Sequence, residues 1–432
     1  MTQSRSGPLW TVVPSVGLSA SGFVFWIVAS WSLDPAELGA VTGLFTTSFF
    51  LVYLTNLGLP VLVTRYATDD SAPSLRIARV AFAIGVMVAS FIGAVVAWAG
   101  VSAVEAVLGP PSLATIATGA ALIGSLGAAT IVDARLLATL RHRTYAAKAL
   151  FISVGRLIVL VIVAAHVPGV GAVFAAAIGL FALSGVVLAP MVLVLRRRDQ
   201  APGAVERPQV QAHTLRNFAI ANYFSQLALQ APLFTTPILA LWWLGADEYA
   251  FFYIAWGAAS VLLIASNVLS QTLVAQGSHS GREKASMTRP LIVGVAIAVL
   301  AAVAAAAIGE QLAGFAYGAD FRPVGALLVP LFLGCAPAIL VAVVTSELRL
   351  AERNRAVVVL TVLYAVLVGV WVALGAAQSQ HSGAALGWLA GNIASIPVSL
   401  TVLRWSRRSV SGGGAGSLST NEAPTPTQTP VS

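Results

Sequence analysis

The sequence predicts an all-α polytopic membrane protein of about 12 transmembrane helices, arranged as two parallel six-helix lobes. Of the 432 residues, 58% are hydrophobic and 9% are charged, and the mean hydropathy is +0.88. Soluble chains carry about 25% charged residues. Apolar runs of the ~20 residues needed to cross a bilayer recur along the chain. The chain also resembles itself at an offset of 211 residues.

We expect twelve membrane spans, six in each half. The first run reaches residue 31, too long for the apolar part of a signal peptide, so we expect this helix to be retained. In the first half the expected spans are 9–31, 40–64, 77–101, 112–135, 146–166 and 171–195. In the second half they are 214–243, 249–274, 289–311, 325–348, 356–376 and 383–404.

The offset of 211 residues superimposes the two sets of spans and pairs Glu37 with Glu248 and Asn56 with Asn267. Because six is an even number, both halves enter the membrane from the same side. A parallel repeat of this kind is a transporter architecture with a site between the lobes. We therefore expect an N-terminal lobe (1–198), a cytoplasmic linker (199–213), a C-terminal lobe (214–408) and a disordered tail (409–432), which is rich in Gly, Ser, Thr and Pro.

Positive charge is confined to alternate connections and to the carboxyl end. The intervening connections contain Arg322 and otherwise acidic residues such as Asp34 and Glu105. By the positive-inside rule, both termini are expected in the cytoplasm, with the chain in the inner (plasma) membrane of a bacterium. The net charge of +8 is thus explained by topology and by contact with membrane lipids, and it gives no reason to expect nucleic acid.

Polar side chains line one face of the first helix of each half. They are Asn222, Gln226 and Gln230 in the second half, with Ser15 and Ser19 at offset-related positions in the first. Spacings of four residues place each set on one helix face. In hydrocarbon such groups need protein or water partners. They therefore indicate either bonds between helices or a water-filled cleft that binds substrate, and their presence in both halves favours the cleft.

Arg156 lies in the run FISVGRLIVLVIVAAH, near the middle of the bilayer. A guanidinium there costs about 3 kcal/mol on insertion scales. It is interpreted either as a structural arginine, snorkelling or paired with Asp133 or Glu347, or as an anchor for an anionic substrate group, since guanidinium binds phosphate oxygens bidentately. Arg65 and Arg216, at the inner ends of their helices, are expected to guide the same group, unless they are interface anchors.

Other chemistry is not indicated. The sequence contains no G-x-x-x-x-G-K-[ST], no H-E-x-x-H and no C-x-x-C. The five histidines are scattered over loops and helix ends. We therefore expect no catalytic residues, no metal, no cofactor and no enzymatic activity.

Residues 23–67 resemble the opening of polysaccharide-biosynthesis membrane proteins. These are the O-antigen and lipid-linked oligosaccharide flippases of the multidrug/oligosaccharidyl-lipid/polysaccharide exporter superfamily. The shared features are L-x-P-A-E-x-G at 33–39, N-L-G-L at 56–59 and the helix-end Arg65. The resemblance implies a V-shaped pair of lobes that moves a polyprenyl-pyrophosphate-linked oligosaccharide to the outer leaflet by alternating access. It also implies that Arg156 meets the pyrophosphate, that the polar stripes meet sugar hydroxyls, and that enzymes of glycan synthesis are candidate partners.

Two alternatives remain open. One is a multidrug or small-molecule exporter, of the same superfamily or of the major-facilitator type. The major-facilitator loop pattern does not fit RYATDDSAPSLR, at 65–76. The other is a scaffold for glycan-synthesis enzymes, which would need no polar interior.

Overall fold

The computed structural model describes residues 9–69, 71–166, 169–194, 212–280, 288–351 and 353–411, and these are almost wholly helical. The N-terminal half contains α1 (Leu9–Ser30), α2 (Pro35–Thr55), α3 (Leu59–Tyr66), α4 (Ala72–Trp98), α5 (Ser102–Leu108), α6 (Leu113–Ala138), α7 (His142–His166) and α8 (Val170–Val194). The C-terminal half contains α9 (Ala212–Trp243), α10 (Ala246–Ser280), α11 (Thr288–Tyr317), the 3-10 turn η1 (Ala319–Phe321), α12 (Pro323–Leu350) and α13 (Asn354–Ser411).

The continuous α13 is in fact two helices joined at a sharp kink. Ser379 and Gln380 have non-helical backbone angles, with φ of −143° and 54°. Eight helices of the described part are long and apolar enough to cross a membrane, and α13 is long enough to do so twice. The chain is therefore a multi-pass membrane protein, and the predicted all-α fold class is confirmed.

Capping residues explain where several helices begin. The Asp34 side chain accepts a hydrogen bond from the Glu37 amide at 2.8 Å, and Glu37 accepts one from the Asp34 amide at 3.2 Å. This capping box, with Pro35 as the first helical residue, starts α2. Ser71 and Ser112 cap α4 and α6 with one hydrogen bond each, accepted from the Ser74 and Thr115 amides. The L-x-P-A-E-x-G motif is thus a helix start.

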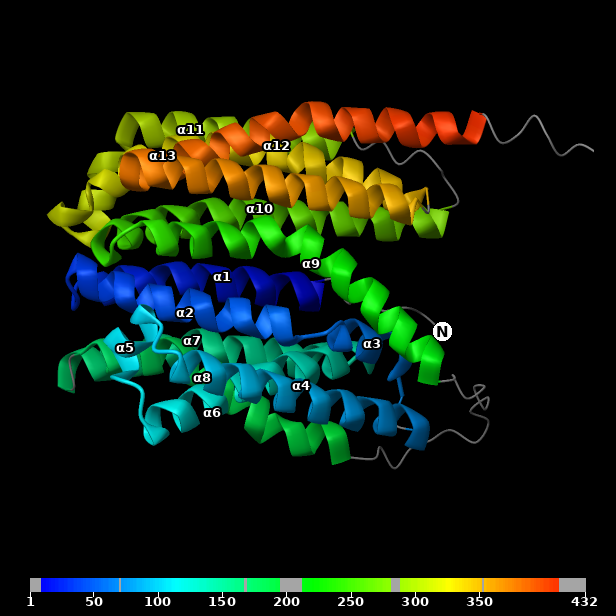
Figure 1. The fold of residues 1–432 in the computed structure, drawn as a ribbon, viewed down its shortest axis with the longest axis horizontal. Helices are drawn as coiled ribbons and strands as arrows, with labels where there is room; N and C mark the ends of the chain where they lie inside the picture. The colour runs from blue at the N-terminus through cyan, green and yellow to red at the C-terminus, as the bar shows by residue number, and fades with distance from the viewer. Residues whose placement is uncertain are drawn as a thin grey trace, which may run out of the picture.

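The repeat relates the two halves helix by helix. Helices α2, α6 and α7 begin at residues 35, 113 and 142. Adding 211 gives 246, 324 and 353, and α10, α12 and α13 begin at 246, 323 and 354. Figure 1 shows α10 to α13 grouped in one lobe and α4 to α8 in the other, with α1 and α2 on the side that faces α9 and α10. The two-lobed arrangement agrees with the expectation.

One expected span differs between the halves. The run 40–64 was expected to be a single helix, but the structure ends α2 at Thr55 and starts the short α3 at Leu59. The connection passes through Leu57 and Gly58, both with positive φ, of 49° and 72°. At the equivalent place in the second half, α10 continues without a break. At the break, Gly58 closely approaches the backbone of α9, where a Cβ would lie 2.2 Å from the Ala219 oxygen.

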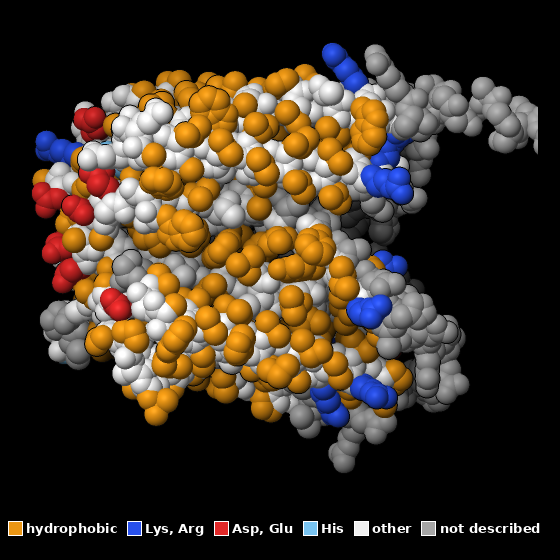
Figure 2. Space-filling model, in the orientation of Figure 1, with side chains coloured by type: hydrophobic (Ala, Val, Ile, Leu, Met, Phe, Trp, Pro, Cys, Tyr) orange, Lys and Arg blue, Asp and Glu red, His pale blue; other side chains and the backbone are white. Residues whose placement is uncertain are grey.

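Charge separates the two ends of the molecule. Figure 2 shows acidic side chains, with some basic atoms beside them, at one end, basic side chains at the other end and a largely apolar surface between them. The beginning of α1 and the end of α13 lie at the basic end (Figure 1). Exposed tryptophans on helix ends, such as Trp98 and Trp242, are typical of the bilayer interface. The expected linker falls almost wholly outside the described residues, as does the tail beyond Ser411.

The lobes are closed against each other at the acidic end. The indole nitrogen of Trp31 donates to the Ala316 oxygen at 2.8 Å, and the Tyr249 hydroxyl donates to the Thr46 hydroxyl at 2.9 Å. Gly39 packs directly on the first residue of α10. Because these contacts join helices of different lobes, this end must open if substrate is to leave through it.

Candidate functional site

Helix α9 belongs to both lobes. Its C-terminal half is buried in the C-terminal lobe, where Thr236 and Ala240 have no exposed surface. Its N-terminal half leaves that lobe and crosses toward α3 (Figure 1). Pro232 and Pro237 lie inside the helix at the bend, where a missing amide donor and the ring of proline favour a change of direction. Helix α9, which carries the polar stripe of the second half, is therefore a bridge between the lobes.

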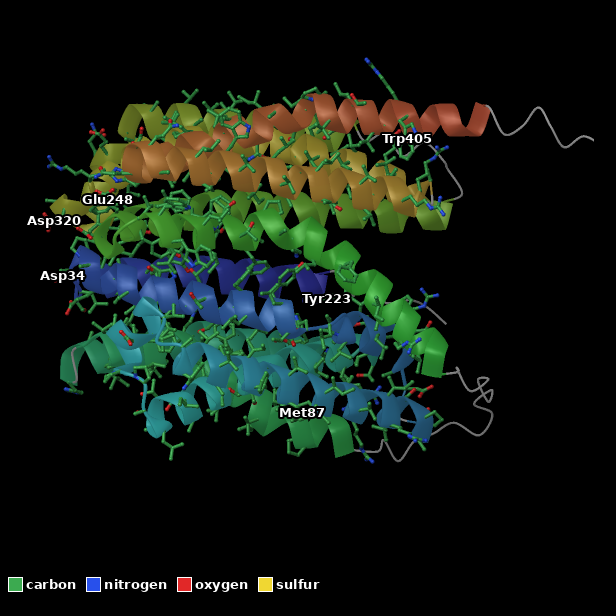
Figure 3. The ribbon with its side chains drawn as sticks, in the orientation of Figure 1. Asp34, Met87, Tyr223, Glu248, Asp320 and Trp405 are labelled. Atoms are coloured by element: carbon green, nitrogen blue, oxygen red, sulfur yellow. The ribbon has the colours of Figure 1, made fainter. Side chains whose placement is uncertain are left out.

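The crossing half of α9 packs on the break between α2 and α3. The Tyr223 hydroxyl donates to the Leu54 oxygen at 2.9 Å (Figure 3 labels Tyr223). The Phe218 and Tyr66 rings meet edge to face with centroids 5.3 Å apart. With the close approach at Gly58, these contacts attach the bridge to the N-terminal lobe.

A pocket of about 170 Å³ lies beneath this crossing, between the two lobes. Its lining includes two tyrosines, an asparagine and a glutamine, and none of its described residues is charged. They are Tyr53, Asn56, Gly58, Pro60, Val61, Tyr223, Leu227 and Gln230. We call this the interlobe pocket.

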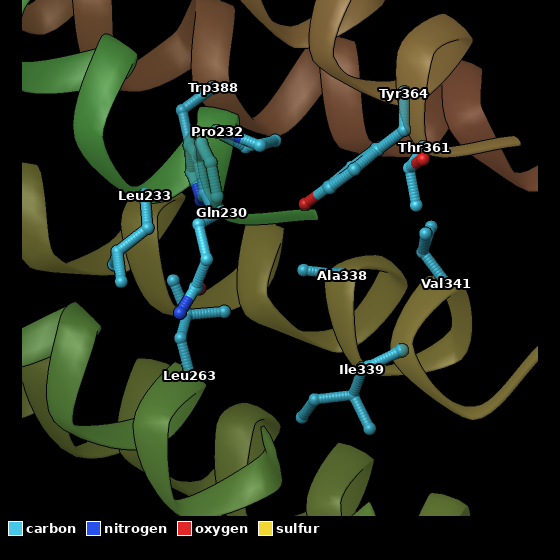
Figure 4. Close-up of a pocket in the computed structure, with 11 residues that line it drawn as sticks. Gln230, Pro232, Leu233, Leu263, Ala338, Ile339, Val341, Thr361, Tyr364 and Trp388 are labelled. Atoms are coloured by element: carbon cyan, nitrogen blue, oxygen red, sulfur yellow. The ribbon is translucent and has the colours of Figure 1, made fainter. Parts of the chain in front are cut away.

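A second pocket, of about 50 Å³, lies inside the C-terminal lobe between α9, α10, α12 and α13. Figure 4 shows mostly apolar side chains around it, with the Tyr364 hydroxyl and the Gln230 amide directed inward. The Tyr364 hydroxyl is within 2.9 Å of the Asn392 side-chain oxygen. Gln230 lines both pockets, so this one predicted site residue lies where the lobes and the two cavities meet.

Arg156 lies near the middle of α7 and is 5% exposed. One terminal nitrogen donates to the Leu18 oxygen at 2.7 Å and to the Ser21 hydroxyl at 2.6 Å, both on α1. The guanidinium also lies 5.9 Å from the Phe25 ring centroid and 5.7 Å from that of Phe181. Its Nε is buried without an acceptor. Among the described residues no carboxylate pairs with it, so the positive charge is held by dipoles and rings.

Of the two acidic partners considered for Arg156, Asp133 is committed elsewhere. Its carboxylate pairs with Lys148 at 2.7 Å, across α6 and α7. The physical reason is proximity, since Lys148 lies two turns closer than Arg156 to the end of α7 that adjoins α6. The suggested Asp133–Arg156 pair is therefore wrong.

The other predicted site residues lie on α1, α3 and α9. Arg65 and Arg216 are exposed, and the Arg65 guanidinium stacks 4.7 Å from the Phe218 ring centroid. Neither arginine lines the interlobe pocket. The side chains of Ser15, Ser19, Asn222 and Gln226 lie outside the described residues, although their backbones are helical.

Three polar residues of the interlobe pocket were not among the predicted site residues: Tyr53, Asn56 and Tyr223. Asn56 was visible as the first residue of the N-L-G-L motif, and a glycine after a long apolar helix is a signal for a break. The tyrosines gave no signal, because aromatic residues near helix ends are common in any membrane protein.

In the described residues, the fold and these contacts define a two-lobed, multi-pass membrane protein in which α9, the first helix of the second lobe, bridges to the first lobe. Solved structures of transporters share this fold. The structure resembles an inward-facing multidrug resistance MATE family transporter of the MOP superfamily, with a TM-score of 0.65, 14% identity and coverage of 93% of this chain and 96% of that one. It also resembles the lipid II flippase MurJ in an inward closed conformation, with a TM-score of 0.65, 9% identity and coverage of 93% and 87%.

A third similar structure is a MATE protein in complex with MaL6, with a TM-score of 0.62, 13% identity and coverage of 94% and 96%. No protein-family profile and no curated protein sequence matches the chain. The resemblance expected from the sequence is therefore confirmed at the level of the fold.

Proposed function

We propose that the protein moves a polyprenyl-pyrophosphate-linked oligosaccharide from the cytoplasmic to the outer leaflet, for synthesis of a cell-surface polysaccharide. The observation that carries the proposal is Arg156, a buried cation at mid-membrane with no described carboxylate partner and one nitrogen without an acceptor. A buried unpaired charge is costly, and an anionic ligand would offset that cost. A phosphate group suits a guanidinium because two of its oxygens can accept the two parallel N–H bonds of the planar guanidinium fork.

The segregated charges support an orientation for this transport. The basic end, where α1 begins and α13 ends, faces the cytoplasm by the positive-inside rule. The membrane is then the plasma membrane of a bacterium. Contacts at Trp31, Thr46 and Gly39 close the opposite, outer end. In this proposal, a closed outer end means that substrate exchanges with the cytoplasmic side, and alternating access requires these contacts to open. Membrane lipids and enzymes of glycan synthesis are the proposed neighbours.

An exporter of small molecules is the second candidate. It is favoured by the structural similarity to a multidrug MATE transporter, whose TM-score of 0.65 equals that of MurJ. The uncharged, aromatic interlobe pocket would also suit an apolar drug. The two candidates differ in what Arg156 does, because a flippase needs its charge and an exporter of neutral or cationic drugs does not.

The experiment compares Arg156→Ala and Arg156→Lys with the parent in a deletion strain. Lipid-linked glycan on each leaflet is measured by its protection from an impermeant glycosidase. We expect Arg156→Ala to leave the glycan on the inner leaflet at normal protein level, and Arg156→Lys to restore part of the transport. Arg322→Ala, an exposed arginine at the acidic end, is the matched control and should transport normally.

A second variant separates binding of an anion from a structural role. Ser21→Ala removes an acceptor of the Arg156 guanidinium without removing its charge. If Arg156 merely fastens α7 to α1, Ser21→Ala should reproduce part of the defect of Arg156→Ala, and both should lower the protein level. Normal flipping in Arg156→Ala would remove the basis of the proposal and favour the exporter.

A further inference from the structure

The interlobe pocket presents unused hydrogen-bonding groups. The Asn56 side-chain oxygen accepts a hydrogen bond from the Thr130 hydroxyl at 3.0 Å, which fixes the amide plane and leaves its NH₂ group without a described acceptor. The Gln230 side chain is half-buried and has no hydrogen bond with a described residue. A terminal amide offers two donors and an acceptor side by side. This arrangement matches neighbouring hydroxyl groups on a ring.

The two tyrosine rings of the pocket are held in place by other side chains. Tyr53 stacks on Phe234, with centroids 4.7 Å apart and an angle of 23° between the rings. Tyr223 is anchored by its hydroxyl to Leu54 and meets Phe224 edge to face at 5.4 Å. An aromatic face carries partial negative charge and attracts the slightly positive C–H groups of an apolar ring face. Because the rings are already ordered, a ligand would lose little of its binding energy to ordering them.

The described lining of the interlobe pocket contains no charged residue, and this favours a neutral ligand. No described residue of the lining carries a carboxylate for a cation or a guanidinium for an anion. The cavity volume of about 170 Å³ is below the roughly 300–1,000 Å³ of sites for drug-sized ligands, so the pocket suits a single small ring. Amide groups together with ordered aromatic rings and no charge are suited to a molecule with hydroxyl groups at its edge and C–H groups on its face.

We propose that the interlobe pocket binds a neutral sugar ring of the transported molecule. This rests on the proposed function, because it assigns the oligosaccharide of the lipid-linked substrate to this pocket and leaves the pyrophosphate to Arg156. Tyr53 and Tyr223 pack against the ring face, while Asn56 and Gln230 bond its hydroxyls. The pocket therefore adds recognition of the saccharide to recognition of the phosphate.

The test measures sugar binding directly, in nanodiscs free of sugar-bearing detergent. Saturation-transfer NMR is recorded with glucose, galactose, mannose, rhamnose and N-acetylglucosamine as separate probes. We expect transfer to the ring C–H protons of at least one sugar. Asn56→Leu and Gln230→Leu should each weaken its binding about fivefold, the effect of one lost hydrogen bond. Thr64→Val, which removes an exposed hydroxyl on α3 that does not line the pocket, is the matched control and should bind as the parent does.

Other outcomes would overturn the proposal. They are absence of transfer to every sugar, or transfer that Asn56→Leu and Gln230→Leu leave unchanged in protein with parental thermal stability. Tetraphenylphosphonium is tested as a cationic probe; if it binds the parent and Gln230→Glu strengthens that binding, the pocket is a drug site. Sugar binding without flipping would contradict the proposed function alone. Flipping that survives loss of sugar binding would contradict only the present inference.

Discussion

Gly39→Ala tests whether the acidic end of the protein is closed by direct contact between the lobes. Gly39 lies in the second turn of α2, buried against Ala246, the first residue of α10. A Cβ at residue 39 would lie 1.7 Å from the Ala246 oxygen, whereas real Cβ contacts essentially never fall below 3.0 Å. The alanine must therefore displace α10 by at least 1.3 Å, the difference between 3.0 and 1.7 Å.

The free-energy cost of this substitution follows from overpacking of the contact between Gly39 and Ala246. Forcing one methyl group into a packed interface costs about 1–3 kcal/mol. Because Ala246 begins a helix of the other lobe, that energy falls on the closed state and is relieved when the lobes separate. The ratio of closed to open molecules should then fall roughly 5- to 150-fold.

The measurement is the distance between spin labels on the two lobes in nanodiscs. Labels at Ala36→Cys and Asp320→Cys occupy exposed positions at the acidic end, and the native Cys335 is buried. We expect Gly39→Ala to add a population with a longer distance. Gly257→Ala is the matched control, because a Cβ there meets nothing within 4 Å. An unchanged distance distribution in folded Gly39→Ala protein would refute the reasoning.

Three further predictions concern the same framework. Lys148→Ala should lower the free energy of unfolding by about 2 kcal/mol, less than the loss of a partner in a fully buried ion pair, because the Asp133 side chain is 36% exposed. The double variant with Asp133→Ala should recover part of the lost thermal stability. Cysteines replacing Tyr66 and Phe218, joined by a short reversible thiol crosslinker, should stop transport until reductant is added; continued transport would mean that α9 stays on α3 throughout the cycle. Trp388→Ala should cost about 3–5 kcal/mol, seen as a lower unfolding temperature, because the indole is 1% exposed; an unchanged temperature would contradict its place in the core.

The helices and their repeat could be predicted from the sequence because hydropathy and spacing determine them locally. The start of α2 at Pro35 follows from the capping box of Asp34 and Glu37, which are neighbours in the chain. The offset of 211 residues needed only the order of apolar runs. By contrast, the pairing of Asp133 with Lys148 depends on which faces of α6 and α7 meet, and hydropathy does not encode that.

The candidate site was less predictable for the same reason. Gln230 was found because amides spaced at four residues are rare in membrane helices. Tyr53 and Tyr223 were not, since they become part of one pocket only when α9 crosses onto the N-terminal lobe. The environment of Arg156 was also undetermined, because its acceptors on α1 lie more than a hundred residues away in the chain.

The difference between the two halves explains why the interlobe pocket forms at the end of α2. At the end of α2 the chain breaks at Leu57 and Gly58, whereas the equivalent stretch of α10 remains helical. The break lets the backbone of α9 approach Gly58, at a distance that any side chain there would prevent. That approach brings Tyr223 and Gln230 over Tyr53 and forms the pocket. A side chain at residue 58 would therefore remove both the bridge and the pocket, while leaving the rest of each lobe intact.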